Sequence, residues 1–536
     1  MYDFEKGNRL PYLLVGLLAV LPLSVSVAYA ETQDATATQG PQVNINEYIV
    51  RGNTVLTARE IERAVYPFLG PQRTLADVES AQQALQEAYQ SKGYQSVYVE
   101  LPEQQVTGGV VILQIMETRV GRVRVVGAKH SSPLAIREEV PALAEGGVPD
   151  FDLVQDQLTE LGRTGQRQVM PMIKEGQVPG TMDVELTVED KNPWSGSLTL
   201  NNDYSADTEE LRSVATLGHS NLWQKGHSAS LTFFTAPEDT DNAEVWSGSY
   251  TAPLSDRWSL RFSGYYSESD VATVGSTNVL GKGHSYGLAA IYSLPFSDNW
   301  MHSVSLGLDM KSFDESVRFG EEADDVPIEY TPITLSYNGY HFSERRSGNF
   351  GVTLVTATDK LISGGSDWEE FRYKRYKASP DFSVLKGTFG LTETLPHGWE
   401  LASKGEWQLA SGPLVSNEQF SAGGSYSVRG YLAAEQSADD GYMLSAELRT
   451  PSIKSWLDLP VSELRFHVFV ESAQMRLRDA MEEQEDKFDL ASVGVGARLQ
   501  VTDWLHGSFD LGYPLVEGPE TDKHDANAHF SVTASF

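Results

Sequence analysis

One short stretch of this sequence has residue types that could carry covalent catalysis. Residues 283–287 read Gly-His-Ser-Tyr-Gly and fit the pattern G-x-S-x-G, which in lipases and esterases holds a nucleophilic serine between a buried strand and a helix. Here the stretch opens an alternating segment with no helical pattern after it, and a similar Gly-His-Ser run at 226–228 opens another such segment. The context therefore argues against a hydrolase, and we expect Ser285 to be an ordinary strand residue.

Metal, thiol and nucleic-acid chemistry is equally poorly supported. The chain has no cysteine, which excludes disulfides, thiolate metal sites and cysteine nucleophiles, and its 11 histidines show no ligand spacing such as H-E-x-x-H. With 41 Lys and Arg against 74 Asp and Glu the net charge is −33, which disfavours binding along a phosphate backbone. We therefore expect no enzyme, no metal, no cofactor and no nucleic-acid partner.

The N-terminus has the order of a secretory signal peptide. Lys6 and Arg9 precede an apolar run over 10–27, which ends in Ala-Tyr-Ala at 28–30. A charged segment, an apolar segment and an A-x-A site predict cleavage after residue 30. An uncleaved membrane anchor is the alternative. Residues 31–42 have no periodicity and are predicted to be a disordered leader.

Two similar α/β modules are predicted next, over residues 43–118 and 119–192. The first has strands at 46–51, 96–101 and 109–117 and helices at 58–65 and 75–92. The second repeats that order, with strands at 121–126, 167–174 and 182–189 and helices at 133–140 and 152–164. Modules of this size offer sheet edges and shallow grooves rather than a catalytic cleft, which suits the addition of an extended client strand.

The first module resembles a known domain type. The run Arg-Gly-Asn-Thr at 51–54, then Thr-Leu-Ala-Asp at 74–77, Gly-Tyr at 93–94, Leu-Pro at 101–102 and Gly-Val-Val at 109–111 is similar to the first POTRA (polypeptide-transport-associated) domain of two-partner secretion transporters. Gly-Arg-Val at 121–123 matches the start of a second POTRA domain.

Residues 193–536 have the pattern of a membrane β-barrel. Apolar residues or glycine recur at every second position, as in 194–202, 258–266 and 505–513, which is typical of a lipid-facing barrel wall. The mean hydropathy of −0.31 excludes a bundle of membrane helices but permits such a wall. We predict sixteen strands, an even number as in bacterial barrels, centred on residues 198, 215, 230, 248, 262, 288, 306, 335, 353, 387, 405, 446, 468, 494, 508 and 532.

Connection lengths and tryptophans give the barrel an orientation. Short predicted turns alternate with long loops at 237–243, 314–327, 359–371, 412–440, 479–489 and 517–527, so the turns are assigned to the periplasm and the loops to the outside. Seven tryptophans lie beside the short turns, as in an interfacial girdle: Trp194, Trp223, Trp258, Trp300, Trp399, Trp456 and Trp504. A soluble β-sandwich or β-solenoid is the alternative.

Two features of the barrel surface predict partners other than a client. The C-terminal strand ends in Phe536, which resembles the signal that the barrel-assembly machinery recognises in outer-membrane proteins. Acidic clusters in the predicted outer loops are either solvated or bridge through divalent cations to the phosphates of lipopolysaccharide; they lie at 207–210, 238–241, 321–325, 482–486 and 517–522. Outer-membrane lipid and lipopolysaccharide are therefore expected to surround the barrel.

The longest loop, residues 412–440, contains a second resemblance. We call it loop 6. Its Gly-Gly at 423–424 is followed by Val428, Arg429, Gly430 and Tyr431, which resemble the sixth-loop motif of the outer-membrane protein assembly superfamily. The resemblance implies that loop 6 folds into the lumen and that its arginine meets acidic residues of the inner wall.

The inner-wall partners of Arg429 are predicted from the same resemblance and from strand alternation. The family usually has Phe-x-Asp where this chain has Phe469 and Glu471, a difference of one methylene, and alternation points Glu471 inward. Glu447 on the preceding strand is a second inward carboxylate. A charge-assisted bond between Arg429 and such a carboxylate could be bidentate. The alternative is a solvated loop arginine.

Together these patterns predict an all-β transmembrane barrel of sixteen antiparallel strands, preceded by two periplasmic α+β POTRA domains, in the outer membrane of a Gram-negative bacterium. The resemblance is to TpsB-type transporters, the haemolysin secretion/activation and filamentous-haemagglutinin transporters of type Vb secretion. It implies that the POTRA domains bind a β-helical exoprotein (TpsA-like), which then crosses the barrel without ATP. An insertase of the same superfamily and a passive porin are the alternatives.

Overall fold

The computed structural model describes residues 42–536 except 163–164, 207, 241–242, 269–270, 275–276, 281, 298, 320–321, 360–364 and 455–459. The predicted signal peptide and nearly all of the predicted leader lie outside the described residues. Two compact units divide the chain, residues 1–117 and 118–536. None of the described helices is both long and apolar enough to cross a membrane.

The first unit is a small α/β module. Strands β2 (Glu47–Arg51), β5 (Val110–Glu117) and β4 (Val97–Glu100) form a sheet in that order, and β1 (Val43–Ile45) pairs separately with β3 (Gly70–Arg73). Helices α1 (Ala58–Val65) and α2 (Leu75–Gln90) each begin at a capping box, in which a threonine and an acidic residue three positions later satisfy free backbone N–H groups. The buried core of this module includes Ile45, Val78 and Val111.

A second module of the same order begins the second unit. Strands β6 (Arg119–Val126), β8 (Thr181–Asp190) and β7 (Arg167–Glu175) form its sheet, with β8 in the centre. Helices α3 (Pro133–Glu138) and α4 (Phe151–Gly162) pack their apolar side chains on that sheet, around Ile136, Val154, Leu161 and Leu186. The predicted helix at 133–140 is shorter than expected because Pro141 cannot continue it and starts a short 3-10 turn over Pro141–Leu143.

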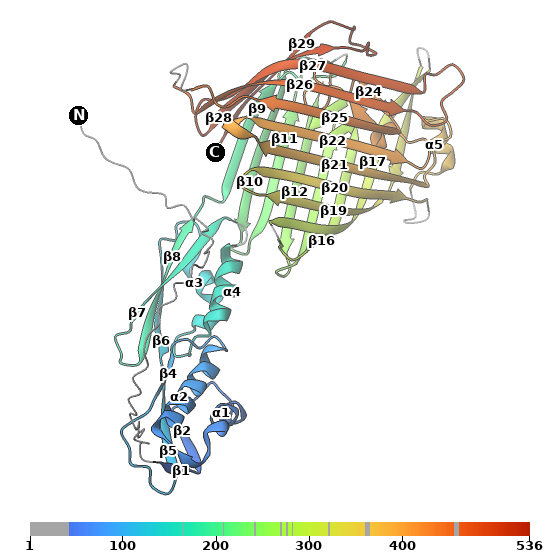
Figure 1. Cartoon of the computed structure of the whole chain (residues 1–536). Helices are drawn as coiled ribbons and strands as arrows, with labels where there is room; N and C mark the ends of the chain where they lie inside the picture. The colour runs from blue at the N-terminus through green and yellow to red at the C-terminus, as the bar shows by residue number, and fades with distance from the viewer. Residues whose placement is uncertain are drawn as a thin grey trace, which may run out of the picture. The chain divides into compact units, whose positions relative to one another are not determined.

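A closed antiparallel barrel forms the rest of the described chain (Figure 1). All sixteen predicted strand centres lie in its strands, which are β9 (Trp194–Asn201), β10 (Arg212–Leu222), β11 (His227–Thr235), β12 (Glu244–Pro253), β13 (Trp258–Ser267), β16 (Gly283–Ser293), β17 (Trp300–Phe319), β19 (Ile333–Phe342), β20 (Arg346–Ala357), β21 (Phe382–Thr394), β22 (Glu400–Ala410), β25 (Asp440–Arg449), β26 (Glu463–Arg476), β27 (Lys487–Gln500), β28 (Leu505–Pro514) and β29 (Asn527–Ser535). β29 pairs with β9 and closes the ring. The predicted fold class is confirmed, whereas the exact domain boundaries stay a prediction.

The outer ends of the barrel differ from the predicted loops. The stretch 314–327 was expected to be irregular, but β17 runs on to Phe319 and pairs there with β18 (Glu322–Tyr330), while its first half pairs with β19. The sequence did not indicate this extension of β17, because residues 314–327 are rich in Asp and Glu and have no apolar–polar alternation. A strand that extends beyond the membrane does not need that alternation. The expected loop 359–371 leads into helix α5 (Trp368–Lys374), which carries a capping box at Asp367.

Alternation sets the two faces of the wall as expected. On β26, Phe466, Val468 and Val470 are about half exposed at the outside, and the residues between them are buried within the lumen. Six of the seven girdle tryptophans lie at strand ends with exposed rings, and Trp456 lies outside the described residues. The side chains that could act on a passing chain are therefore the inward-facing ones.

Candidate functional site in the barrel lumen

Loop 6 folds back among the inward-facing side chains. It leaves β22, passes a short 3-10 turn (Ser416–Glu418) and forms a two-stranded stem from β23 (Phe420–Ala422) and β24 (Gln436–Ala438) before β25 begins. Residues 423–435 between the two stem strands form what we call the tip. Val428, Arg429 and Tyr431 in the tip are 0–4% exposed.

Arg429 is bound by three carboxylates of the inner wall. Its Nε and Nη2 donate to Oε1 of Glu471 at 3.1 and 2.7 Å, and its backbone N–H donates to Oε2 of the same residue at 2.7 Å. Its Nη1 donates to Glu447 at 2.8 Å and to Asp510 at 2.9 Å. The guanidinium carbon also lies 3.6 Å from the centre of the Phe469 ring, a cation–π contact. A planar five-donor group suits this arrangement, and a lysine would not.

Strand register explains why these side chains converge. Ser445 of β25 lies opposite Glu471 of β26, and Glu447 lies opposite Phe469. Phe469 in turn lies opposite Gly494 of β27, where an added Cβ would come within 2.1 Å of its ring. The glycine therefore leaves the space in which the Phe469 ring can lie beneath the guanidinium.

Further charges on the wall hold the carboxylates in place. Glu447 also accepts from Arg449 at 2.7 Å and from Arg498 at 3.0 Å, and Asp510 lies 2.5 Å from Nε2 of His467. Burying several charges is favourable only when each is paired, because a lone buried charge loses its hydration without compensation. Arg429 is the one cation that all three carboxylates share: Glu447 is also paired with Arg449 and Arg498, and Asp510 with His467, whereas Glu471 has only the Ser445 hydroxyl besides Arg429 among the described residues.

Gly430 brings the tip backbone onto the wall. Its φ of +96° is a left-handed conformation that favours glycine, and its N–H donates to Nε2 of His529 at 2.8 Å. Its backbone packs directly on Gly512 of β28, where a Cβ would lie 2.5 Å from the Gly430 nitrogen. Two glycines are therefore needed for this contact, one on the loop and one on the wall.

Val428 and Tyr431 complete the attachment with apolar contacts. Both pack in a cluster with Met443, Ala473 and Met475 of the wall. The Tyr431 hydroxyl donates to the carbonyl of Val516 at 2.6 Å. Each of the four motif residues thus has a distinct contact.

The structure places the loop residues 428–431 against the predicted wall residues Glu447, Phe469 and Glu471. Three further residues at this site were not predicted as partners of the loop. Asp510, His529 and His467 belong to the same network. The inward direction of Asp510 could be predicted from strand alternation, because its neighbours Phe509 and Leu511 are apolar and face outward. Nothing in the pattern indicated, however, that β28 and β29 face the tip of loop 6.

Substituting Gly512 should displace the tip without removing a charge. In Gly512→Ala the new Cβ would overlap the backbone of Arg429 and Gly430, and both segments are held by their neighbours. We expect the ion conductance of the purified protein in planar lipid bilayers to rise severalfold. Gly412→Ala is the control, because no heavy atom lies within 4 Å of its added Cβ. An unchanged conductance of Gly512→Ala would contradict tight docking of the tip.

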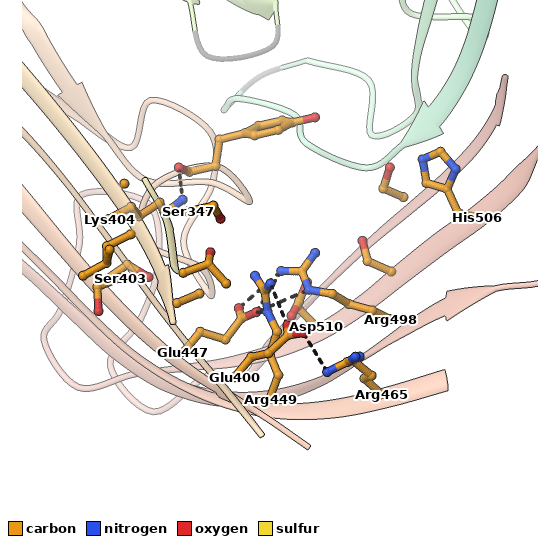
Figure 2. Close-up of a pocket in the computed structure, with 18 of the residues that line it drawn as sticks. Ser347, Glu400, Ser403, Lys404, Glu447, Arg449, Arg465, Arg498, His506 and Asp510 are labelled. Atoms are coloured by element: carbon orange, nitrogen blue, oxygen red, sulfur yellow. Dashed lines mark hydrogen bonds and ion pairs between the residues drawn. The ribbon is translucent and has the colours of Figure 1, made fainter. Parts of the chain in front are cut away.

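A cavity of about 1140 Å³ lies beside the network. Figure 2 shows Glu447, Arg498, Asp510 and Arg465 gathered on one side of this cavity and Lys404 on another. Lys404 donates to the carbonyl of Tyr426 at 2.6 Å, so the tip also forms part of the cavity wall. Among the described residues, no group of three or more His, Asp or Glu side chains is arranged to hold a metal ion.

Two other stretches that were noted in the sequence lie elsewhere in the barrel. Ser285 is in β16, paired with β13 and β17, and the next described element is again a barrel strand rather than a helix. Phe536 follows β29, exchanges backbone hydrogen bonds with Gly196 and has a 76% exposed side chain. Its role as an assembly signal stays a prediction.

Comparison with known proteins agrees with this arrangement. The sequence profile described as haemolysin secretion/activation protein ShlB/FhaC/HecB matches residues 180–499, and the profile of the ShlB-type POTRA domain matches residues 43–118. The outer membrane transporter CdiB of Escherichia coli is 24% identical over 507 residues, which cover 90% of this chain and 81% of CdiB. The heme/hemopexin transporter protein HuxB of Haemophilus influenzae is 20% identical over 409 residues, covering 74% and 70%.

Solved structures show the same fold. CdiB from Escherichia coli superposes with a TM-score of 0.58 at 18% identity, covering 94% of this chain and 93% of CdiB. BamA from Haemophilus ducreyi lacking POTRA domains 1–3 gives 0.54 at 16% identity, covering 92% of this chain and all of that one. Since the family profile spans more than half of the sequence, this chain belongs to the haemolysin secretion/activation (ShlB/FhaC/HecB) family of two-partner secretion transporters, which lie in the outer membrane with their POTRA domains in the periplasm.

Proposed function

We propose that this protein captures an unfolded secreted partner in the periplasm and passes it through the barrel to the outside, without nucleotide hydrolysis. The partner is a β-rich exoprotein, and its folding outside the cell makes transport directional. The resting lumen is occupied by the tip of loop 6, bound through Arg429 to Glu471, Glu447 and Asp510, so the tip has to move for the client to pass. While the tip is docked, the cavity beside it has a volume of about 1140 Å³, which is too small to hold a folded domain.

The observation that carries the capture step is a difference between the edges of the two POTRA-type sheets. In the first module the outer edge of β4 is covered, because Gln86 of α2 bonds the backbone of Val97 and Val99 and Gln82 bonds Val99 again. In the second module no side chain of the described residues bonds the backbone along the outer edge of β7. An edge without partners can accept an extended strand.

The side chains of β7 suit a client of variable sequence. Met170, Met172 and Ile173 are 42–50% exposed and lie within four consecutive residues, so they form an apolar stretch along β7. Methionine adapts its shape to different partners and is common on surfaces that bind many sequences.

Charged substitutions on the two edges should separate capture from general surface effects. In the full-length protein we expect Met172→Asp to weaken binding of a urea-denatured N-terminal segment of the exoprotein at least tenfold, measured by surface plasmon resonance. Tyr98→Asp is the matched control, because Tyr98 is an exposed apolar residue, 59% exposed, on the covered edge of β4. Equal losses in both variants, or equal binding of the folded segment, would disprove capture at β7.

A further inference from the structure

Loop 6 contains a second buried charge, remote from its motif. Glu418, at the start of the loop, is 2% exposed. Its Oε1 lies 2.5 Å from Nζ of Lys311 and accepts from the Tyr330 hydroxyl at 2.8 Å, and its Oε2 lies 3.7 Å from Nζ of Lys386. A carboxylate with two cations and a hydroxyl around it is as well paired as Arg429 at the other end of the loop.

We call Glu418 and Arg429 the two anchors of loop 6. They bind different strands of the barrel wall and carry opposite charges. Lys311, Tyr330 and Lys386 belong to β17, β18 and β21, whereas the partners of Arg429 belong to β25, β26 and β28. At the first site the wall is cationic and the loop supplies the acid. At the second the wall is acidic and the loop supplies the base. Within the described part of the chain, neither lysine has an ion-pair partner other than Glu418.

The base of loop 6 is held by a further set of contacts. Gln408 of β22 donates to the backbone carbonyls of both Glu418 and Asp439, at 2.9 and 3.0 Å. It therefore links the segment that enters loop 6 to the segment that leaves it. The carboxylate of Asp439 is fully buried and takes both Nη groups of Arg375, at 2.5 and 2.7 Å. The stem β23–β24 continues from this base.

Two glycines lie where the stem meets the tip. Gly423 and Gly424 have φ angles of +114° and +91°, in the left-handed region that glycine adopts without strain. Such positions absorb large backbone changes, so they allow the tip to rotate relative to the stem. Along the chain, the contacts of Glu418 come before these glycines and the contacts of the tip come after them, and Asp439 binds the base again where the loop returns.

We propose that Glu418 is a positioning residue for transport: it keeps the base of loop 6 bound to the wall while the tip leaves the Arg429 site. Loop 6 then moves as an arm hinged at Gly423 and Gly424 and does not leave the lumen as a whole. This inference rests on the proposed function, because it concerns how the tip clears the path for a client.

The absence of cysteine allows a direct test in the full-length protein. Ser427→Cys reports on the tip and Ser421→Cys on the stem, and both are small changes at partly buried serines. Labelling of each in intact cells with a membrane-impermeant maleimide measures how often each part is exposed. Secretion is not needed for this readout, so a failure of the hinge is distinguishable from a failure of the proposed transport.

The two anchors should give opposite labelling patterns. With Arg429→Ala we expect at least tenfold faster labelling at Ser427→Cys and no change at Ser421→Cys. With Glu418→Gln, which keeps the shape but leaves two lysines without a counter-charge, we expect at least tenfold faster labelling at Ser421→Cys. Glu393→Gln, which removes an exposed acid paired with Arg346, should change neither rate. Equal acceleration at both probes by Arg429→Ala would overturn the hinge.

A double variant that exchanges the charges of Glu418 and Lys311 controls for misfolding of the single variant. If Glu418→Gln prevents insertion, Glu418→Lys combined with Lys311→Glu restores a pair of opposite charges at the same place. We expect this double variant to return stem labelling to within threefold of the wild-type rate, and secretion to follow. Inserted protein in which neither Glu418→Gln nor Glu418→Lys alone alters stem labelling would show that Glu418 does not anchor the loop.

Discussion

Arg429→Ala should reduce secretion of the exoprotein by two to three orders of magnitude while the barrel still reaches the outer membrane. The substitution leaves Glu471, Glu447 and Asp510 buried without their shared cation, and breaking a buried pair in this way costs roughly 3–5 kcal/mol. Since each 1.4 kcal/mol is a factor of ten, the equilibrium ratio of docked to undocked tip should fall by roughly two to three and a half orders of magnitude. The measurement is exoprotein in the culture medium, divided by the amount of heat-modifiable barrel.

Several matched variants test the Arg429 prediction. Arg346→Ala removes an arginine of an exposed pair with Glu393, which is worth little, and should secrete normally. Glu471→Asp keeps the charge and should retain most activity, whereas Glu471→Lys places a cation against Arg429 and should fail. The double reversal Arg429→Glu with Glu471→Arg should recover part of the activity at most, since Glu447 and Asp510 would then repel the new carboxylate. Normal secretion by Arg429→Ala at normal abundance would show that the motif has no transport role here.

Deletion of residues 43–190 should abolish secretion completely and leave a conducting barrel. All barrel strands begin at or after Trp194, so the deletion removes both POTRA-type modules and no part of the wall. Without them the client has no binding site in the periplasm, whereas ions still pass the lumen. Secretion is measured in cells, and conductance is measured with the purified protein in planar bilayers.

The same deletion separates the transporter from a passive porin. A porin needs no periplasmic module, so its transport of small solutes would be unaffected and no protein would depend on residues 43–190. Met172→Asp provides the matched point variant, since it leaves the modules in place and changes one exposed side chain of β7. Secretion that persists after the deletion would refute a role for these modules in capture.

The barrel was predictable from sequence because its determinant is local. Lipid on one face and a polar lumen on the other impose a period of two on a barrel strand, and stretches such as 194–202, 258–266 and 505–513 show it without reference to their neighbours. The extension of β17 with β18 and the helix α5 were not predicted, because outside the membrane that constraint is lifted. There, pairing depends on contacts such as those of Tyr330 with Phe371 and Phe382.

Strand alternation predicted that Glu447 and Glu471 face inward, and a family resemblance implied that Arg429 meets them. That Asp510 joins this site, that His529 accepts from Gly430 and that Glu418 binds Lys311 on another part of the wall is evident only in the folded chain. Alternation fixes the face of a side chain but not its neighbours across a lumen. Those neighbours depend on barrel closure and on the path of loop 6, and residues more than a hundred positions apart, such as Lys311 and Glu418, are joined only by that path.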